Sequence, residues 1–246
     1  MRSKAQEGGN TQVDYEYPYS SFKITSSETI TISDGSTTFD SVSYDSSYPL
    51  IAGAALILDS STLDASSNDS SLNWCISGNT FGTGDYGTPG SANDGCNTVA
   101  DLSAGDLIVS EVMIDPTKVF DYRGEYIEIY NTTGTSFNLK GLEIQTTGEA
   151  GHTITADVYA PANDYTVLSV RLTPSNNGGV NAAYQYTYTE AKLYNVDSVS
   201  LLSGASTIDS VSWDNSWPLA AGKSLSLTPS LLNSTSNDAV GSWCEG

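Results

Sequence analysis

The chain has 246 residues, with 29 acidic side chains, nine basic ones and a formal net charge of −20 at pH 7. So few Lys and Arg residues exclude strong binding to duplex nucleic acid or to an anionic membrane surface, because both are bound through cations. No apolar run approaches the roughly 18 residues of a membrane span. The many Ser, Thr, Asp, Asn, Gly and Tyr residues favour strands and turns, so we expect an all-β protein.

Short alternating segments near the start of the chain predict four strands, over residues 13–19, 28–33, 38–44 and 54–58. Between the second and third strands, Asp34-Gly35 is a dipeptide typical of a hairpin turn. A stretch rich in Ser, Asp and Asn follows over residues 59–73 and predicts a loop. None of these segments has a helical period.

Two cysteines, Cys75 and Cys96, enclose a glycine-rich loop that suggests no regular element. We interpret the pair as a disulfide, which would stabilise the fold by roughly 3 kcal/mol in the chain-entropy model. Free thiols are the alternative. A zinc site would need further Cys or His ligands nearby, and His152 is the only histidine of the chain. A disulfide implies an oxidising compartment, so we expect an extracellular or cell-surface protein.

Residues 97–105 predict a polar linker, and a second series of short strands follows it. The segments are 107–114, 125–130, 139–144, 153–158, 165–170, 183–188, 198–202, 208–213 and 224–227. In the second of these, Ile127 and Ile129 share one face and Tyr126 and Glu128 the other. Short strands at this spacing, with turn residues between them, indicate a β-sandwich or a barrel.

One sequence pattern occurs twice, at an offset of 169 residues. Residues 40–50 (DSVSYDSSYPL) correspond to residues 209–219 (DSVSWDNSWPL), and Trp74-Cys75 corresponds to Trp243-Cys244. We interpret this as a tandem duplication. Residues 1–96 are then the C-terminal half of a first domain, and residues 106–246 a nearly complete second domain. In this register, we expect the opening strands of the first copy to precede Met1 and the partner of Cys244 to follow Gly246.

The second copy resembles a known family. The segments that carry the resemblance are DLIVSEVMIDP at residues 106–116, GEYIEIYN at 124–131 and LKGL at 139–142. The DSVS-aromatic block with Pro218 and Gly222, and GTPGSAN at residues 87–93, also match. Together these are similar to the bacterial lamin-tail domain, with Leu142 in place of the usual Trp. The resemblance covers all of the second copy and the back half of the first.

This resemblance implies an immunoglobulin-like β-sandwich that serves secreted or surface-attached bacterial proteins as a non-catalytic accessory module. We therefore expect a structural or adhesive module that mediates protein–protein assembly. The alternative is a carbohydrate-binding accessory module of a secreted enzyme. As the partner we expect another copy or chain that completes the first half-domain, while a glycan is possible under the alternative.

Acidic residues gather around the first strands of the second copy: Glu111, Asp115, Asp121, Glu125 and Glu128. Calcium takes six to eight oxygen ligands, and a loop between adjacent strands can supply them. Glu111, Asp115, Asp121 and Glu125 are accordingly our candidate calcium ligands. The spacing of an EF-hand loop is missing, and a solvated acidic loop is the alternative.

Two further groups of residues bear on catalysis and on sugar binding. A Ser-His-Asp triad would have to use His152, which lies in a turn-like stretch without a Gly-x-Ser-x-Gly elbow, so we expect an exposed loop histidine. Tyr44, Tyr48, Trp213 and Trp217 could form a sugar-binding platform. Their equivalent places in the two copies favour packing instead.

Overall fold

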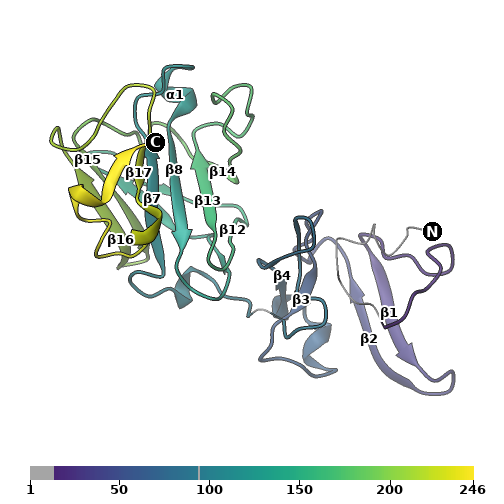
Figure 1. Ribbon diagram of the computed structural model, residues 1–246. Coiled ribbons are helices and arrows are strands. Elements are labelled where there is room, and N and C mark those ends of the chain that lie inside the picture. Colours follow the sequence, from purple (N-terminus) through teal and green to yellow (C-terminus); the bar gives the residue numbers. More distant parts are fainter. Residues whose placement is uncertain (1–13, 94) are drawn as a thin grey trace. The chain divides into compact units, whose positions relative to one another are not determined.

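The computed structural model describes residues 14–93 and 95–246 (Figure 1). The chain forms two compact units, Met1–Cys96 and Asn97–Gly246, and each is considered by itself. Strands dominate both units, which confirms the predicted all-β class. In the described part of the chain, no helix has the length and apolar character needed to cross a bilayer.

The first unit contains three antiparallel strand pairs. They are β1 (Glu28–Ser33) with β2 (Thr38–Tyr44), β3 (Leu56–Leu58) with β4 (Trp74–Ile76), and β5 (Thr80–Phe81) with β6 (Asp85–Tyr86). The β1–β2 hairpin has the predicted bounds and turn. Asp34 Oδ1 accepts the backbone N–H groups of Ser36 and Thr37, and Gly35 takes the positive φ of 91° that this turn requires.

Two predictions for the first unit need correction. The strand expected over 13–19 is wrong as far as it can be examined: Val13 lies outside the described residues, and residues 14–19 are irregular. The alternating tyrosines of this segment point into solvent, and no neighbouring strand pairs with them. The loop expected over 59–73 contains two short 3-10 helices, η2 (Ser67–Asp69) and η3 (Ser71–Asn73).

The second unit is a sandwich of two sheets (Figure 1). One sheet has the order β11-β10-β15-β16, with β10 (Glu143–Thr146), β11 (His152–Thr153), β15 (Asp197–Ser203) and β16 (Ser206–Trp213). The other has the order β14-β13-β8-β7-β17-β18. Its strands are β7 (Leu107–Met113), β8 (Tyr126–Asn131), β13 (Tyr165–Ser169), β14 (Tyr184–Gln185), β17 (Leu225–Leu227) and β18 (Trp243–Glu245).

Smaller elements complete this unit. They are β9 (Phe137–Asn138), β12 (Tyr159–Ala160), the single helical turn α1 (Asp121–Gly124) and the 3-10 helices η4 (Val99–Asp101), η5 (Pro229–Leu231) and η6 (Val240–Ser242). The strand expected over 139–144 starts only at Glu143, because Gly141 has a φ of 94° and turns the chain just before it. The predicted linker belongs to the second unit, where Val99 and Leu102 pack against the core.

The hydrophobic core of the second unit lies between its two sheets. Strand β8 has the predicted alternation, with Ile127 and Ile129 fully buried and Tyr126 and Glu128 half-buried on the opposite face. In β7, Leu107, Ile108 and Val109 are all inaccessible to solvent. Strand β7 pairs with β8 and β17 in its own sheet and packs against β15 and β16 of the other. It therefore lies at the centre of the sandwich.

Candidate functional site

A buried clamp of side chains holds the backbone of β7 in the second unit. Asp209 Oδ2, on β16, accepts the Val109 N–H at 2.8 Å and the Asn237 side-chain amide at 2.7 Å. The same amide also reaches the Val109 carbonyl oxygen at 3.4 Å, and Trp243 Nε1 donates to the Asn237 carbonyl oxygen at 2.8 Å. Burial raises the pKa of Asp209 to about 6, against the lowering effect of these hydrogen bonds. We call Asp209, Asn237 and Trp243 the second clamp.

The first unit contains the same three side chains, each 169 residues earlier. Asp40 Oδ2 accepts the Asn68 amide at 2.7 Å, and Trp74 Nε1 donates to the Asn68 carbonyl oxygen at 2.8 Å. We call Asp40, Asn68 and Trp74 the first clamp. Sequence reasoning did not identify either clamp, although the repeated Asp, Asn and Trp positions were the signal that could have revealed both.

Apolar side chains that are buried in the second unit have exposed counterparts in the first. Tyr17, Phe22, Ile24, Ile32 and Phe39 are 46, 43, 58, 60 and 60% exposed. The residues 169 positions later, Tyr186, Ala191, Leu193, Leu201 and Ile208, are 0, 0, 3, 0 and 2% exposed. The same chemistry at the same register is therefore covered in one unit and uncovered in the other.

Part of this uncovered surface lies on the β1–β2 hairpin. Ile30 and Val42 are directly paired across the two strands, and Ile32 pairs with Asp40 of the first clamp. Phe39 lies beside them at the irregularity in the β1–β2 pairing. We call Ile30, Ile32, Phe39 and Val42 the hairpin face. The clamp carboxylate thus lies beside two exposed apolar side chains, Ile32 and Phe39, while Ile30 and Val42 are half-buried.

The predicted acidic cluster does not form a metal-binding group within the described residues, where no three His, Cys, Asp or Glu side chains are placed to hold an ion. Glu111 accepts a short hydrogen bond from the Tyr126 hydroxyl. Asp115 is exposed after β7, and Asp121 begins α1. Glu125 points into the protein interior. Glu111 and Glu125 are therefore engaged in separate hydrogen bonds, with Tyr126 and with the Leu193 N–H.

Glu125 is the most perturbed acid of the four. Its side chain has no exposure to solvent, its Oε2 accepts the Leu193 N–H at 3.0 Å, and its Oε1 has no hydrogen-bond partner. Burial, with a smaller contribution from the nearby charge of Asp121, raises the pKa of Glu125 to about 8. A buried carboxyl of this kind is a poor match for a calcium ligand, which must be ionised and accessible to the ion.

His152 is not the exposed loop residue that its sequence context predicts. It lies on β11 and is 7% exposed. Its Nδ1 is 2.6 Å from Glu190 Oε2, and its Nε2 is 3.0 Å from the Tyr184 hydroxyl. The prediction was wrong because β11 pairs with β10 through His152 and Ile144, which places the ring under the segment that contains β14. Both ring nitrogens are engaged by structural partners.

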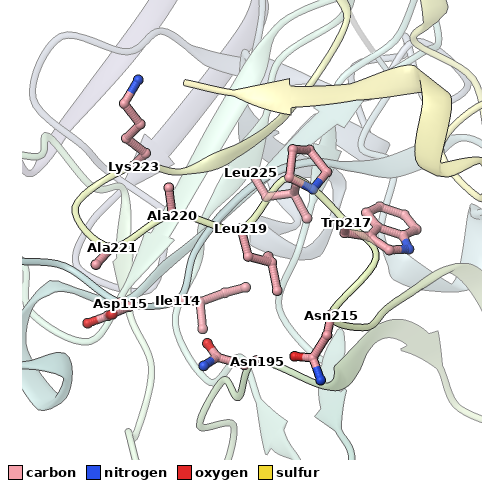
Figure 2. Close-up of a pocket in the computed structure, with 11 residues that line it drawn as sticks. Ile114, Asp115, Asn195, Asn215, Trp217, Leu219, Ala220, Ala221, Lys223 and Leu225 are labelled. Carbon is pink, nitrogen blue, oxygen red and sulfur yellow. The ribbon is translucent and has the colours of Figure 1, made fainter.

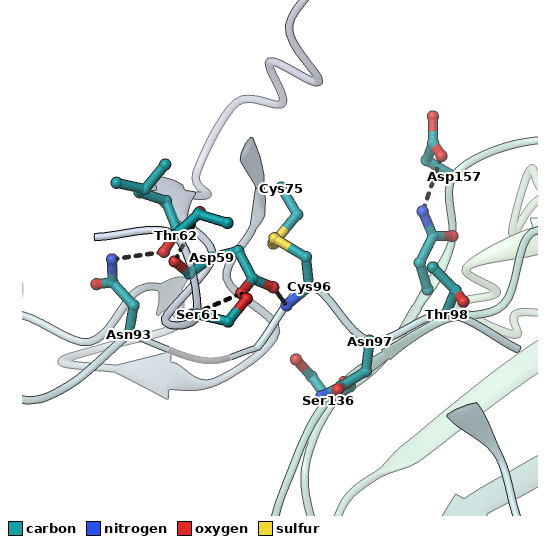
Figure 3. Close-up of a disulfide and its surroundings, with 12 residues drawn as sticks. Asp59, Ser61, Thr62, Cys75, Asn93, Cys96, Asn97, Thr98, Ser136 and Asp157 are labelled. Carbon is teal, nitrogen blue, oxygen red and sulfur yellow. Dashed lines mark hydrogen bonds between the residues drawn. A yellow bond between two sulfur atoms is a disulfide. The ribbon is translucent and has the colours of Figure 1, made fainter. Parts of the chain in front are cut away.

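The predicted disulfide between Cys75 and Cys96 is present and belongs to the first unit (Figure 3). Asp59 Oδ2 accepts the Cys96 N–H at 2.8 Å, while its Oδ1 accepts from Ser61. The Asn93 side chain donates to the Leu58 carbonyl oxygen at 3.0 Å. These bonds fasten the end of the glycine-rich loop to β3. Cys244 is a free, exposed thiol.

A pocket of about 250 Å³ opens on the second unit beside the segment that follows β16 (Figure 2). Trp217 and Leu219 supply apolar surface, and Asn195, Asn215 and Asp115 supply amide and carboxylate groups. Trp217 packs against Trp243 at 5.7 Å between ring centroids. An aromatic ring beside amides and a carboxylate is a combination that can bind a sugar.

The other aromatic residues singled out in the sequence are packing residues. Tyr44 and Tyr48 are each 7% exposed, and their rings meet edge to face at 6.3 Å. Trp213 is 3% exposed and donates through Nε1 to the Tyr194 carbonyl oxygen. Of the four aromatics, Trp217 alone lines the pocket.

The comparisons with known proteins agree with the second unit's architecture. Residues 101–215 match the model of the Lamin Tail Domain family, which has an immunoglobulin-like β-sandwich fold. No curated protein matches the chain. The match begins just before β7 and ends beyond β16, so it includes both strands that the second clamp joins. Residues 101–215 of this chain are therefore the part that is similar to lamin tail domains.

Proposed function

We propose that this chain is a non-catalytic structural or adhesive module of an extracellular or cell-surface protein, and that it mediates protein–protein assembly. The main observation in favour of this proposal is the exposure of the hairpin face. Its counterparts in the second unit are core residues, whereas Ile32 and Phe39 are each 60% exposed. Exposed apolar surface of this kind is typical of an interaction site.

The chemistry of the described residues supports a role without catalysis. Lamin tail domains are in general non-enzymatic modules. The ring of His152, the one histidine of the chain, is held by Glu190 and Tyr184. The two carboxyl groups whose pKa is raised most, Glu125 and Asp209, are both buried and bonded to backbone N–H groups. These perturbations are explained by folding contacts.

An extracellular or surface location is supported by the Cys75–Cys96 disulfide, because such bonds persist in oxidising compartments. The resemblance to bacterial lamin-tail domains extends this proposal to a secreted bacterial protein. The net charge of −20 suits a soluble surface module, since a high net charge opposes non-specific association.

The state of the chain in solution tests the proposed assembly role. Without its natural partner, the hairpin face should pair with another copy, so the mass from light scattering should rise above 26.0 kDa as concentration increases. The double variant Ile32→Ser/Phe39→Ser should stay at the monomer mass. A matched control, Leu63→Ser/Leu72→Ser, changes two exposed leucines outside the hairpin and should associate like the wild type. A wild-type chain that stays monomeric throughout would contradict the proposal.

The pocket around Trp217 favours a second candidate, a carbohydrate-binding accessory module of a secreted enzyme. The pocket combines one indole with the side chains of Asn195, Asn215 and Asp115. Glycan-array binding that Trp217→Ala abolishes would support this function. Phe120→Ala is the control, because Phe120 is a 72% exposed aromatic outside the pocket. If the wild-type chain binds no glycan on the array, the carbohydrate-binding function is contradicted.

A further inference from the structure

We propose that the first clamp and the hairpin face bind one β-strand supplied by a separate polypeptide, and that this strand has the chemistry of Leu107–Met113. The inference rests on the proposed assembly function and specifies the partner.

The second clamp shows what such a site does when it is filled. Asp209 accepts a hydrogen bond from the backbone N–H of Val109, and the Asn237 amide donates to the Val109 carbonyl oxygen, so both hydrogen bonds are to main-chain groups. A carboxylate and an amide on this spacing therefore recognise an extended backbone. Hydrogen bonds to a charged group are among the stronger ones in proteins.

The first clamp is already assembled in the same geometry. The Asn-to-Asp hydrogen bond is 2.7 Å in both clamps, and the Trp-to-Asn hydrogen bond is 2.8 Å in both. Asn68 is 8% exposed, so it is fixed in place, while Asp40 is only partly buried. Because both side chains are held before binding, little side-chain ordering opposes the arrival of a strand.

A strand edge lies beside the clamp. In the second unit, β17 pairs with β18 on one side and with β7 on the other, through Leu225 and Ser226. The corresponding strand of the first unit, β3, forms a two-stranded sheet with β4 in the described residues. The positions equivalent to Leu225 and Ser226 are Leu56 and Ile57. Strand addition at an edge of this kind is a common mode of peptide recognition.

The hairpin face indicates which side chains the incoming strand should have. In the second unit, the corresponding surface of β15 and β16 packs against β7. Four residues of β7 are at most 1% exposed: Leu107, Ile108, Val109 and Val112. The strand that covers Ile32 and Phe39 should therefore be rich in aliphatic residues. A polar or highly charged peptide would leave this apolar surface uncompensated.

The strand of this chemistry in the described chain, β7, is already paired on both sides, with β8 and with β17 in the second unit. We therefore assign the strand that fills the first clamp to a separate polypeptide.

The test is binding of a fluorescein-labelled peptide with the sequence of residues 105–115 (GDLIVSEVMID) to the full chain, measured by fluorescence anisotropy. Saturable binding with one peptide per chain is expected. Asp40→Ala should weaken it at least tenfold, and Asp14→Ala should leave it unchanged, because Asp14 is an exposed acid outside the clamp.

A second arm leaves the protein unaltered, in case Asp40→Ala disturbs folding. A peptide carrying an N-methyl group on the residue equivalent to Val109 keeps every side chain but lacks the N–H that the clamp accepts. It should also bind at least tenfold more weakly. Equal binding of the two peptides, or no saturable binding of either, would overturn the inference.

The same samples separate this inference from the proposed assembly role. Bound peptide should cover the hairpin face and return self-associated chains to the monomer mass. If the chains associate through Ile32 and Phe39 but do not bind the peptide, the assembly role stands and a second copy is the occupant. If the chains neither associate nor bind the peptide, both proposals are wrong.

Discussion

The backbone N–H of Leu193 donates a 3.0 Å hydrogen bond to Glu125 Oε2, across 68 residues of sequence. The bond joins the start of β8 to the segment just before β15. It places a carboxyl group where solvent cannot reach it, and burial raises the pKa of that carboxyl to about 8 from the ordinary 4.5.

This raised pKa predicts how stability depends on pH. The folded state binds the Glu125 proton more tightly than the unfolded state does, so the contribution of Glu125 to the free energy of unfolding is largest below about pH 4.5 and is lost as the pH rises to about 8. Each unit of pKa difference corresponds to about 1.4 kcal/mol, so the loss is on the order of a few kcal/mol. Glu125→Gln should remove most of this slope in urea unfolding followed by tryptophan fluorescence.

A charge-matched control for that experiment is Glu16→Gln, which removes an exposed acid of the first unit and should keep the wild-type slope. Asp209, with a pKa of about 6, leaves a smaller fall in stability in the Glu125→Gln variant. A slope unchanged by Glu125→Gln would show that the buried carboxyl is not the group responsible.

Removing the His152 ring should destabilise the second unit. His152→Ala leaves Glu190 and Tyr184 without their contacts to the imidazole and opens space beneath β14. The expected loss is about 1–3 kcal/mol, measured by chemical unfolding. Tyr194→Phe is a suitable comparison, because it removes a hydrogen bond to Glu149 at the surface and should cost under about 0.5 kcal/mol. Equal effects of the two substitutions would contradict a structural role for the histidine.

The thiols give a direct test of the disulfide. Before reduction, an alkylating reagent should modify Cys244 and leave Cys75 and Cys96 intact, as read from peptide masses. The double variant Cys75→Ala/Cys96→Ala should destabilise the first unit by roughly 3 kcal/mol. Cys244→Ala provides the control and should leave stability unchanged. Modification of all three cysteines in folded, unreduced protein would exclude the bond.

Added calcium should change the Tm by less than about 1 °C. The acids predicted to bind it are divided among a hydrogen bond to Tyr126, the start of α1 and the interior near Leu193. Since a ligand stabilises only in proportion to its binding to the folded state, a scattered set of carboxylates gives little shift. Differential scanning fluorimetry over a calcium titration measures it. A saturable rise that Asp121→Ala abolishes would restore the calcium site.

The sequence predicted the sandwich well where alternation coincides with burial. Strand β8 is an example, because Ile127 and Ile129 alternate with half-buried residues and lie in the core between the two sheets. The same period misled the prediction around Tyr15 and Tyr17, where the alternating side chains have no covering sheet among the described residues. Alternation reports which side chains share a face, and it does not report whether anything packs on that face.

The buried polar groups of the site were harder to predict from the sequence than the sandwich. Glu125 directly precedes β8 and has the same alternation as Ile127 and Ile129, but this pattern does not identify the Leu193 N–H as its hydrogen-bond partner. His152 lies on a strand of two residues, which is too short to show a period. The clamps depend on contacts such as Asn237 to Asp209 that join distant segments. A sequence shows such contacts only indirectly, through the recurrence of the same residue types.

The disulfide has a mechanical consequence for a chain held under tension. Cys75 and Cys96 are 21 positions apart, and a fully extended residue spans about 3.5 Å. When the first unit is pulled open from its ends, the force passes through the sulfur atoms and the intervening loop bears none of it. About 70 Å of chain therefore cannot extend under force until the disulfide is reduced. In a single-molecule stretching experiment, reduction should therefore lengthen the unfolding step of this unit by about that amount.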